Sequence, residues 1–328
     1  MRCLSCMKIT PKEYCSSCIK EFFDGIEVTY LDFDKNGFIM ARNELKDTMS
    51  ISGVQDKISL GFNDRGKLLP TESKGRYILK PIPNSNFKNL NDIAANEHLS
   101  MQISSKIFKI ETAQSALIKL KDGELAYITK RFDYISPKSD AKYNQEDFCS
   151  VLDTNSHTGG RNYKYESSYE DISIAIDKFI ATSRIAQEDF LKRVILNFLL
   201  SNGDAHLKNF SLIRDTKEMK LSPNYDILNT RIHVDDTEMA LDLLKDDEFT
   251  KTYDALGFYS YADIKEFSLR QGIKEKRFKK IIDEIVSYTS KVKMMVENSF
   301  LSDKMKKIYI NMYMNNLDKK LLYRLSLK

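Results

Sequence analysis

The stretch Ser201–Phe210, SNGDAHLKNF, decides the fold. It follows the segment Glu188–Leu200, whose apolar residues recur at helical spacing and predict one buried helix. A glycine readily takes the left-handed conformation that ends a helix, so we expect Gly203 to form this cap. A short apolar strand, Phe210–Ile213, is predicted next. The polar residues in between should therefore stand on a rigid turn between two buried elements.

Polar residues of this turn have a spacing that suits phosphoryl transfer. Asp204 is followed five residues later by Asn209, and a second carboxylate, Asp226, lies in the segment Asn224–Leu228. Phosphoryl transfer needs a carboxylate that accepts the proton of the attacking hydroxyl, and oxygen ligands for Mg²⁺. The alternative is structural, because Asp and Asn often hydrogen-bond their own backbone in turns. We expect His206 to orient the loop by hydrogen bonding.

A lysine and a glutamate upstream complete this pattern. Lys80 ends the apolar strand Tyr77–Lys80 and can present a positive charge to phosphates. Glu97 lies on a helix predicted over Asp92–Ile107, with Asn91 as its N-cap. From that helix Glu97 can hold Lys80 in an ion pair. A surface pair without a role in phosphate binding is the alternative.

Two β-like runs predict a hairpin at the end of the strand-rich first part of the chain. The runs are Ser115–Leu120 and Ala126–Phe132, joined through Lys121-Asp122-Gly123. A strand that leads from one lobe to another can carry adenine, with backbone groups bonding its edge. Phe132 or its neighbours would then pack on the base.

The segment Met49–Leu60, MSISGVQDKISL, combines two hydroxyls, Ser50 and Ser52, with one glycine and a strand predicted over Ile58–Phe62. A turn of small residues before a strand can lay its backbone N–H groups against phosphates. An ordinary turn is the alternative, because the usual nucleotide loops have several glycines. Lys57 is interpreted as a surface lysine of the strand, with help in neutralising phosphate as the alternative.

Four cysteines are crowded at the start of the chain. Cys3 and Cys6 form one C-x2-C pair, and Cys15 and Cys18 form another. Two such pairs predict a closed zinc site of four thiolates, which would be structural because no coordination position stays open. Reduced thiols on a frayed N-terminus are the alternative. Cys149 stands alone and is interpreted as a packing residue.

The whole-chain composition is that of a folded globular protein. The chain has 328 residues, 42% of them hydrophobic, and its net charge of +4 permits an acidic partner without requiring nucleic acid. No stretch approaches the ~20 apolar residues of a membrane span, and the start has no signal-peptide core. We therefore expect a cytoplasmic protein. The basic run Lys274–Lys280 is interpreted as a solvated helix face, and we expect no direct nucleic-acid binding.

The order of these patterns predicts an α+β fold of two lobes. Residues 1–45 form a cysteine-containing N-terminal segment. Residues 46–135 form a strand-rich lobe that contains the serine loop, our name for the segment Met49–Leu60 with Ser50 and Ser52. Residues 136–328 form a C-terminal lobe predicted to be all-helical. Ser260 and Asp263 predict a helix start, and Gly272 a stop. A cleft between two such lobes is a natural ligand site.

Seven segments in this sequence together resemble the HipA-type toxin kinases, and the short HipT branch in particular. In chain order they are SISGVQDK, YILKP, NEHLSM, ITKRFD, QEDF, NGDAHLKNFSL and YDIL. These motifs span about Thr48 to Leu228. The resemblance implies a protein-kinase-like fold that binds ATP and Mg²⁺ between its lobes and phosphorylates a protein on serine or threonine.

The resemblance also assigns roles to individual residues. Asp204 is implied to be the catalytic base, and Asn209 and Asp226 the Mg²⁺ ligands. The residues implied to bind the nucleotide are Lys80, Ser52, Gly53, Val54, Lys130, Arg131, Phe132, His206 and Lys208. Ser50 matches the autophosphorylated serine of the family, and Ser52 adds a second hydroxyl, as in the short branch.

Partners follow from the same resemblance. Full-length members carry an extra N-terminal subdomain, for which the roughly forty-five residues before the serine loop are too few. In the short branch that piece is a separate small antitoxin, so we expect such a partner together with a DNA-binding antitoxin. Known substrates of the family are aminoacyl-tRNA synthetases. Two other functions stay open, a catalytically silent ATP-binding regulator and a small-molecule phosphotransferase, as does export to a host cell.

Overall fold

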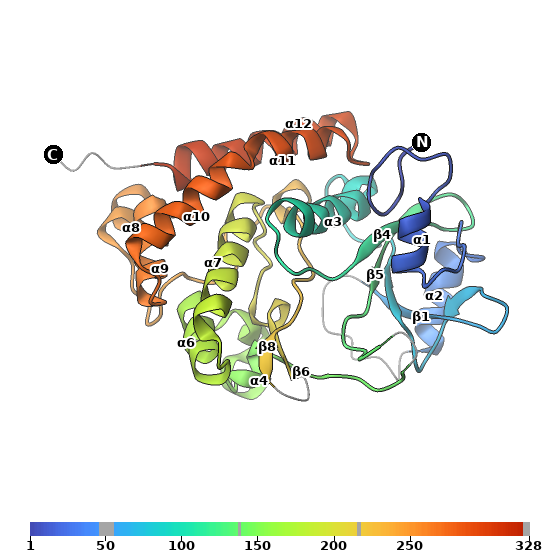
Figure 1. Cartoon of the computed structure of the whole chain (residues 1–328), viewed down its shortest axis with the longest axis horizontal. Helices are drawn as coiled ribbons and strands as arrows, with labels where there is room; N and C mark the ends of the chain where they lie inside the picture. The colour runs from blue at the N-terminus through green and yellow to red at the C-terminus, as the bar shows by residue number, and fades with distance from the viewer. Residues whose placement is uncertain (46–55, 137–138, 215–217, 324–328) are drawn as a thin grey trace.

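An antiparallel sheet of five strands is the centre of the first lobe (Figure 1). The computed structural model describes residues 1–45, 56–136, 139–214 and 218–323. The strands are β1 (Ile58–Phe62), β2 (Leu68–Pro70), β3 (Tyr77–Lys80), β4 (Ser115–Lys119) and β5 (Leu125–Lys130). They lie in the order β2-β1-β3-β5-β4, and β4 and β5 form the predicted hairpin. Both β1 and β3 have the predicted bounds.

Helix α3 (Ile93–Gln102) packs on β4 and β5, and all of its residues are buried. A π-helical turn, η2 (Ile103–Ile107), continues it to the predicted end. A 3-10 turn, η1 (Leu90–Asp92), precedes it, so α3 starts after Asp92 rather than after the predicted cap Asn91. A helix covered on every side is positioned by its neighbours, which matters here because α3 carries Glu97.

The N-terminal segment lies against the sheet of the first lobe. It contains two helices, α1 (Ser16–Phe22) and α2 (Lys35–Glu44). Phe22 and Phe23, at the end of α1, are 2% and 0% exposed and belong to the hydrophobic core. The hydroxyl of Tyr77 on β3 donates a 2.7 Å hydrogen bond to the Phe22 carbonyl. The segment is thus packed onto the lobe that follows it.

The second lobe is mostly helical and also holds a small antiparallel sheet. Its first helical elements are α4 (Phe148–Val151), α5 (Ser156–Gly159), η3 (Gly160–Tyr165), α6 (Tyr169–Phe179), α7 (Ser183–Leu199), η4 (Leu207–Asn209) and η5 (Thr230–Ile232). The strands β6 (Asn144–Asp147), β7 (Ser211–Arg214) and β8 (Met219–Leu221) pair in that order. The all-helical prediction was therefore wrong in this respect. Strand β7 lies where a short strand was predicted over Phe210–Ile213. The polar strand β6, NQED, has no apolar residue to mark it, and β8, MKL, is too short for its alternation to indicate a strand.

The last helices run along one edge of the molecule from the second lobe to the first (Figure 1). They are α8 (Lys251–Leu256), α9 (Tyr261–Arg270), α10 (Glu275–Ser287), α11 (Thr289–Glu297), α12 (Asp303–Met314) and the π-helical η6 (Asn315–Leu321). The predicted capping box of Ser260 and Asp263 starts α9. On α12, the Tyr309 hydroxyl lies 2.9 Å from the Ser100 hydroxyl on α3. The C-terminal helices therefore contact the helix that carries Glu97.

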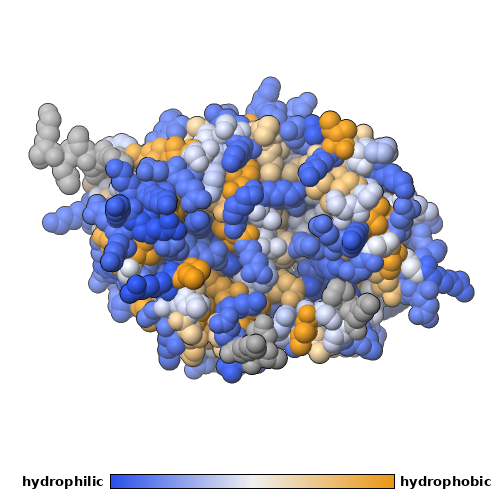
Figure 2. Space-filling model, viewed as in Figure 1, coloured by the Kyte–Doolittle hydropathy of each residue, from blue (hydrophilic) through white to orange (hydrophobic). Residues whose placement is uncertain are grey.

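The surface of the molecule is largely hydrophilic on the face shown in Figure 2, with hydrophobic residues in small scattered groups. The buried apolar side chains of the N-terminal segment and of both lobes form one connected core. Among the helices that the structure describes, none has the length and apolar character needed to cross a bilayer.

Candidate active site

Lys80 is the centre of a buried ion-pair cluster between the two lobes. Its ammonium group lies 2.7 Å from a carboxylate oxygen of Glu97 on α3 and also donates to the carboxylate of Asp226 from the second lobe. Lys80 is 8% exposed and Glu97 2% exposed. Buried charges are stable only when they are paired in this way. The predicted pair of Lys80 and Glu97 is thus joined by a third partner.

The electrostatics of the cluster favour a charged lysine and a charged aspartate. Burial opposes the ammonium form of Lys80, but the carboxylates of Asp226 and Glu97 outweigh burial and raise its pKa. Burial also acts against the Asp226 carboxylate, yet the nearby Lys80 lowers its pKa to about 2. Burial raises the pKa of Glu97 to about 7 against the opposing effect of Lys80. Of the two carboxylates, Asp226 is therefore the one that is more firmly ionised near pH 7.

Asn209 and Asp226 form the oxygen-rich side of the site. The Asn209 amide nitrogen donates a 3.2 Å hydrogen bond to the second oxygen of Asp226. The Asn209 side-chain oxygen is buried, and no partner for it occurs in the described part of the chain. Asp226 adopts a left-handed backbone with φ 60° and keeps 38% of its side chain exposed. A carboxylate beside an unpaired amide oxygen is a donor set that suits Mg²⁺.

The turn that holds Asp204 differs from its predicted form in one residue. Ser201, not Gly203, takes the left-handed conformation after helix α7, with φ 54°. Gly203 is needed for space instead, since a Cβ there would lie 2.5 Å from both the Asp236 carboxylate and the Thr237 carbonyl. The Gly203 N–H donates a 2.9 Å hydrogen bond to the Thr230 hydroxyl. Close packing against the segment after η5 therefore fixes the turn.

The Asp204 carboxylate faces three side chains. The Tyr165 hydroxyl, from η3, donates a hydrogen bond to it. The Lys164 ammonium lies 3.8 Å away and the His206 Nε2 3.6 Å away, both measured to the same carboxylate oxygen. Asp204 remains 40% exposed, so a substrate hydroxyl has room to approach it. The sequence indicated Asp204 but gave no signal for Tyr165 or Lys164.

His206 orients the turn that carries Asp204. Its Nδ1 accepts a 3.3 Å hydrogen bond from the Lys208 main chain, which leaves Nε2 to face Asp204. Burial lowers the pKa of His206 to about 4, so the ring is neutral near pH 7. The Lys208 ammonium lies 5.1 Å from the centre of the Tyr163 ring. The turn is thus held by local bonds on the Lys208 side as well as by packing on the Gly203 side.

The three consecutive residues Lys130, Arg131 and Phe132, predicted to bind the nucleotide, have different contacts. The Lys130 ammonium lies 2.7 Å from the Asp24 carboxylate in the N-terminal segment. Arg131 pairs with Asp133 at 2.7 Å. The Phe132 ring, in contrast, packs on Tyr225, next to Asp226, with ring centres 5.5 Å apart. The structure therefore brings Phe132 toward the site but not the two charged side chains.

Lys57, interpreted above as a strand surface lysine that could also help to neutralise phosphate, is influenced by the charges of the ion-pair cluster. Its side chain is half-buried just before β1, and burial lowers its pKa. The charges of Asp226, Lys80, Glu97 and Lys208 all act on the pKa of its ammonium group. Its position next to a strand that pairs with β3 was the only available signal. Ser50, Ser52, Gly53 and Val54 lie outside the described residues.

The four N-terminal cysteines come together in a second site on the first lobe. Their sulfur atoms all lie within 4.8 Å of one another. Cys3 and Cys18 are buried, whereas Cys6 and Cys15 are partly exposed. The predicted packing residue Cys149 is buried elsewhere, at 2% exposure.

A strand-rich lobe that carries a lysine–glutamate pair, beside a mostly helical lobe that carries Asp204, Asn209 and Asp226, defines a protein-kinase-like fold. Residues 49–292 match the family described as HipA-like C-terminal domain. The chain belongs to this HipA-like family.

Relatives of this chain are named as kinases. One from Haemophilus influenzae, named "Putative kinase", is 30% identical over 287 residues, which are 83% of this chain and 81% of the relative. The serine/threonine-protein kinase toxin HipA of Shewanella oneidensis is 24% identical over 66% of this chain, and the match spans only 50% of that protein. Kinase activity is thus the property named across the family.

Two solved structures have a similar fold. The Shewanella oneidensis toxin–antitoxin complex of HipA, HipB and operator DNA matches with a TM-score of 0.60 and 19% identity, covering 88% of this chain and 70% of the other. The Helicobacter pylori proinflammatory kinase CtkA matches with a TM-score of 0.51 and 18% identity. The match covers 80% of this chain and 90% of that kinase. The predicted two-lobed, protein-kinase-like fold is confirmed.

Proposed function

We propose that this chain is an ATP- and Mg²⁺-dependent serine/threonine protein kinase that acts as the toxin of a bacterial toxin–antitoxin system. The observation that carries the proposal is the cluster in which Lys80 contacts both Glu97 and Asp226, while Asn209 contacts Asp226. A phosphoryl transfer site requires a positively charged lysine held by a carboxylate, together with carboxylate and amide oxygens that can bind Mg²⁺.

Each residue of the cluster has a distinct task in this proposal. Lys80 binds phosphate oxygens of ATP, and Glu97 keeps its ammonium group in place. Asp226 and Asn209 hold Mg²⁺, which fits the unpaired buried oxygen of Asn209. Mg²⁺ supplies charge neutralisation at the phosphate oxygens when it is bound. Lys57, whose pKa is lowered by burial near the same carboxylates, adds positive charge on the phosphate side.

Asp204 is the proposed general base. The attacking serine or threonine oxygen forms a bond to the terminal phosphorus of ATP, the bond from that phosphorus to ADP breaks, and the hydroxyl proton passes to Asp204. Asp204 is open enough for this role, and Tyr165 and His206 orient it by meeting the same carboxylate oxygen. An incoming hydroxyl has to share the carboxylate with Tyr165.

The nucleotide and the serine loop complete the proposed site. Phe132, packed on Tyr225, offers an aromatic face for adenine next to Asp226. Backbone groups of Ser52, Gly53 and Val54 are proposed to cover the phosphates. Autophosphorylation of Ser50 or Ser52 would add a charge of about −1.5 to −2 and repel the loop from the triphosphate. Such a modification would limit the activity of the kinase.

The proposed partners and target follow the family. The Shewanella oneidensis structure contains HipA together with HipB and operator DNA. By analogy, we propose a DNA-binding antitoxin for this chain, and a small antitoxin that takes the place of an extra N-terminal subdomain, as in the HipT branch. An aminoacyl-tRNA synthetase is the proposed protein substrate, since blocking tRNA charging would stop growth.

The decisive experiment is phosphoproteomics of bacteria that express the wild-type chain or its Asp204→Asn variant. We expect one cellular protein, together with Ser50 or Ser52, to be phosphorylated only with the wild-type chain. Incubation of the pure protein with labelled ATP and Mg²⁺ should give the same result in solution. Absence of label in any protein would reject the kinase in favour of a silent regulator, and label confined to a small solute would indicate a small-molecule phosphotransferase.

A further inference from the structure

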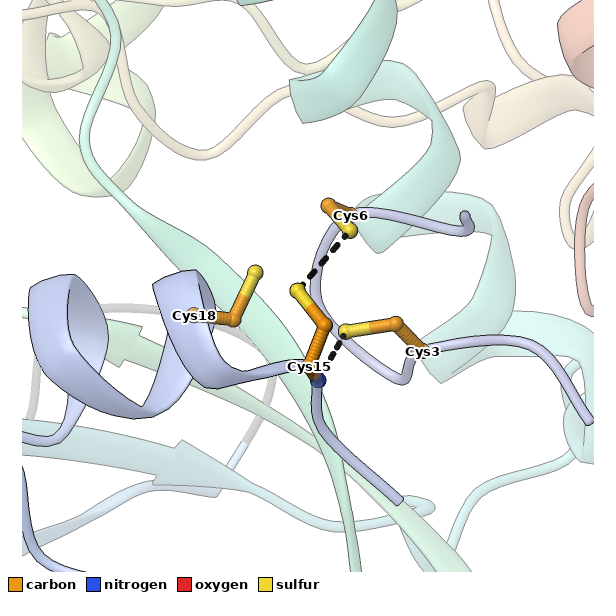
Figure 3. Close-up of side chains that lie close together, drawn as sticks. All are labelled: Cys3, Cys6, Cys15 and Cys18. Atoms are coloured by element: carbon orange, nitrogen blue, oxygen red, sulfur yellow. Dashed lines mark hydrogen bonds between the residues drawn. The ribbon is translucent and has the colours of Figure 1, made fainter. Parts of the chain in front are cut away.

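We propose that Cys3, Cys6, Cys15 and Cys18 bind one Zn²⁺ ion in a tetrahedral four-thiolate site that fastens the N-terminal segment to the sheet and to α3. The sulfur atoms point toward a common centre, Cys3 and Cys6 from the first loop and Cys15 and Cys18 from the start of α1 (Figure 3). This site is separate from the phosphate site and has no part in the phosphoryl transfer proposed above.

The spacing of the sulfur atoms fits zinc. A Zn–S bond of about 2.3 Å in a tetrahedron places sulfur atoms about 3.8 Å apart. The Cys6 and Cys15 sulfurs are 3.7 Å apart, and all four lie within 4.8 Å. A disulfide requires a separation of about 2.05 Å, and all four cysteines are free. Four sulfur donors from two C-x2-C pairs close the coordination sphere, as in structural zinc sites.

The backbone around the cysteines has the form of a metal-binding turn. The Met7 N–H donates a 2.9 Å hydrogen bond to the Cys3 carbonyl, and Met7 itself is left-handed with φ 63°. The Cys15 N–H donates to the Cys3 sulfur at 3.3 Å. A hydrogen bond from a backbone N–H stabilises negative charge on a ligand sulfur and fixes its direction. Both pairs of cysteines are therefore preorganised for one ion.

The loop between the first two cysteines is bonded to the first lobe. Leu4 accepts a 2.8 Å hydrogen bond from the Leu117 N–H on β4 through its carbonyl. The Ser5 hydroxyl donates to the Ser115 carbonyl at 3.3 Å. Because the segment has only short helices of its own, a metal ion is an effective means of holding such a loop in one conformation.

The same loop also contacts α3, at the residue next to Glu97. The His98 Nε2–H donates a 2.8 Å hydrogen bond to the Ser5 carbonyl, and His98 is fully buried. The Lys106 ammonium donates to the Cys6 carbonyl at 3.1 Å. Zinc would thus hold the carbonyl groups that position α3, and α3 in turn positions Glu97, the partner of Lys80. This effect of zinc on Glu97 rests on the proposed ATP site, whereas the metal site itself does not.

The first test measures the metal content of the full chain. The protein is purified without chelator, and its metals are quantified by inductively coupled plasma mass spectrometry. We expect about one zinc per chain in the wild-type protein, and a loss of most of it in Cys18→Ser. Cys149→Ser is the matched control, since it removes a buried cysteine outside the cluster and should keep the zinc. A wild-type chain without zinc, or one that carries iron in its place, would overturn the proposal.

A second test does not depend on how well the variants fold. Wild-type protein stripped of metal and supplied with Co²⁺ alone should show the sulfur-to-cobalt charge-transfer bands and intense visible bands of a tetrahedral thiolate site. Added Zn²⁺ should abolish them by displacing cobalt. A spectrum of octahedral, weakly absorbing cobalt would refute four-thiolate binding.

The coupling to α3 is tested by ATP binding to the same preparations. We expect removal of zinc to weaken ATP affinity roughly tenfold and re-addition of Zn²⁺ to restore it. Stoichiometric zinc with unchanged ATP affinity would refute the coupling and leave the metal site standing. Zinc in a chain that binds no ATP at all would instead contradict the proposed kinase function.

Discussion

Asn96 and Asn229 exchange two buried hydrogen bonds across the two lobes, although they are 133 residues apart in sequence. The Asn96 amide donates to the Asn229 carbonyl at 2.8 Å, and the Asn229 N–H donates to the Asn96 side-chain oxygen at 3.1 Å. Asn96 is the neighbour of Glu97 on α3. The second lobe therefore takes part in placing the helix on which the Lys80 ion pair depends.

Replacement of Asn96 by alanine should destabilise the protein. The substitution leaves the Asn229 N–H and carbonyl buried without their partners, which costs about 2–3 kcal/mol of the free energy of unfolding. Asn43→Ala, on the exposed side of α2, is the control and should have little effect. Denaturant unfolding of both variants measures the difference. If the two variants were equally stable, the hydrogen bonds between Asn96 and Asn229 would not be what holds α3.

His233 makes the same contact sensitive to pH. Its Nε2 lies 2.9 Å from the Asn96 amide nitrogen and its Nδ1 2.9 Å from the Lys88 carbonyl. A carbonyl only accepts, so Nδ1 carries the proton and Nε2 accepts from Asn96 in the neutral ring. Protonation of Nε2 would set two donors against each other.

Burial lowers the pKa of His233 below its ordinary value. A histidine with a depressed folded-state pKa stabilises the protein fully above the unfolded pKa of about 6.5, and this stabilisation is lost as the pH falls below that value. We expect the melting temperature of the wild-type chain to drop on acidification more than that of His233→Gln. If the melting temperatures of the two proteins fell by the same amount on acidification, the prediction would be contradicted.

Lys80 and its partner Glu97 should not contribute equally to activity. Lys80→Met removes the phosphate-binding charge and should lower the rate by more than about 100-fold. Glu97→Gln leaves the Asp226 contact in place, so a loss of roughly tenfold is expected. Lys121→Met, on the exposed hairpin turn, serves as the control. Initial rates with saturating ATP separate the variants, and a Lys80→Met protein with normal rate would refute the site.

Asn209 should determine how much Mg²⁺ the reaction needs. Asn209→Ala removes the buried oxygen and the hydrogen bond to Asp226, so the Mg²⁺ concentration for half-maximal rate should rise about tenfold. Asn209→Asp keeps an oxygen donor at that position and should lie between wild type and alanine. An unchanged Mg²⁺ dependence in the alanine variant would show that Asn209 is not a ligand.

Asp204→Asn should abolish phosphorylation without unfolding the chain. The amide oxygen of Asn can still accept the hydrogen bond from the Tyr165 hydroxyl, but it cannot take up the proton of the substrate. Tyr165→Phe leaves the base itself intact and should lower the rate by less than about tenfold. Thermal unfolding and label incorporation, measured on the same samples, distinguish loss of chemistry from loss of fold.

The sequence predicted the parts of the fold that have strong local patterns. Strands β1 and β3 and the hairpin of β4 and β5 follow from apolar runs and a turn, and the capping box of Ser260 and Asp263 starts α9 as expected. The polar strand β6 lacks such a pattern and depends on pairing with β7. It could not be predicted locally, because its stability comes from the partner strand.

The site shows the same division between local and long-range information. Asp204, Asn209, Asp226, Lys80 and Glu97 were indicated by spacing, and the structure joins Lys80, Glu97, Asp226 and Asn209 by direct contacts. Tyr165 reaches Asp204 from 39 residues away, and no local pattern marks a tyrosine for such a contact. Ser201 takes the left-handed position expected for Gly203, whereas Gly203 is needed because a Cβ there would clash with residues 236 and 237. That clash depends on residues more than 30 positions away, which no local pattern reveals.

The contact between Ser100 and Tyr309 gives the end of the chain an unexpected importance. Helix α12 supplies no residue of the proposed phosphate site, yet its Tyr309 contacts Ser100 on the helix that carries Glu97. A premature stop codon before Tyr309 would leave every proposed catalytic residue encoded and still remove one support of that helix. Under the proposed toxin function, late nonsense mutations should therefore be found among bacteria that survive expression of the chain, and a chain cut after α11 should have no kinase activity.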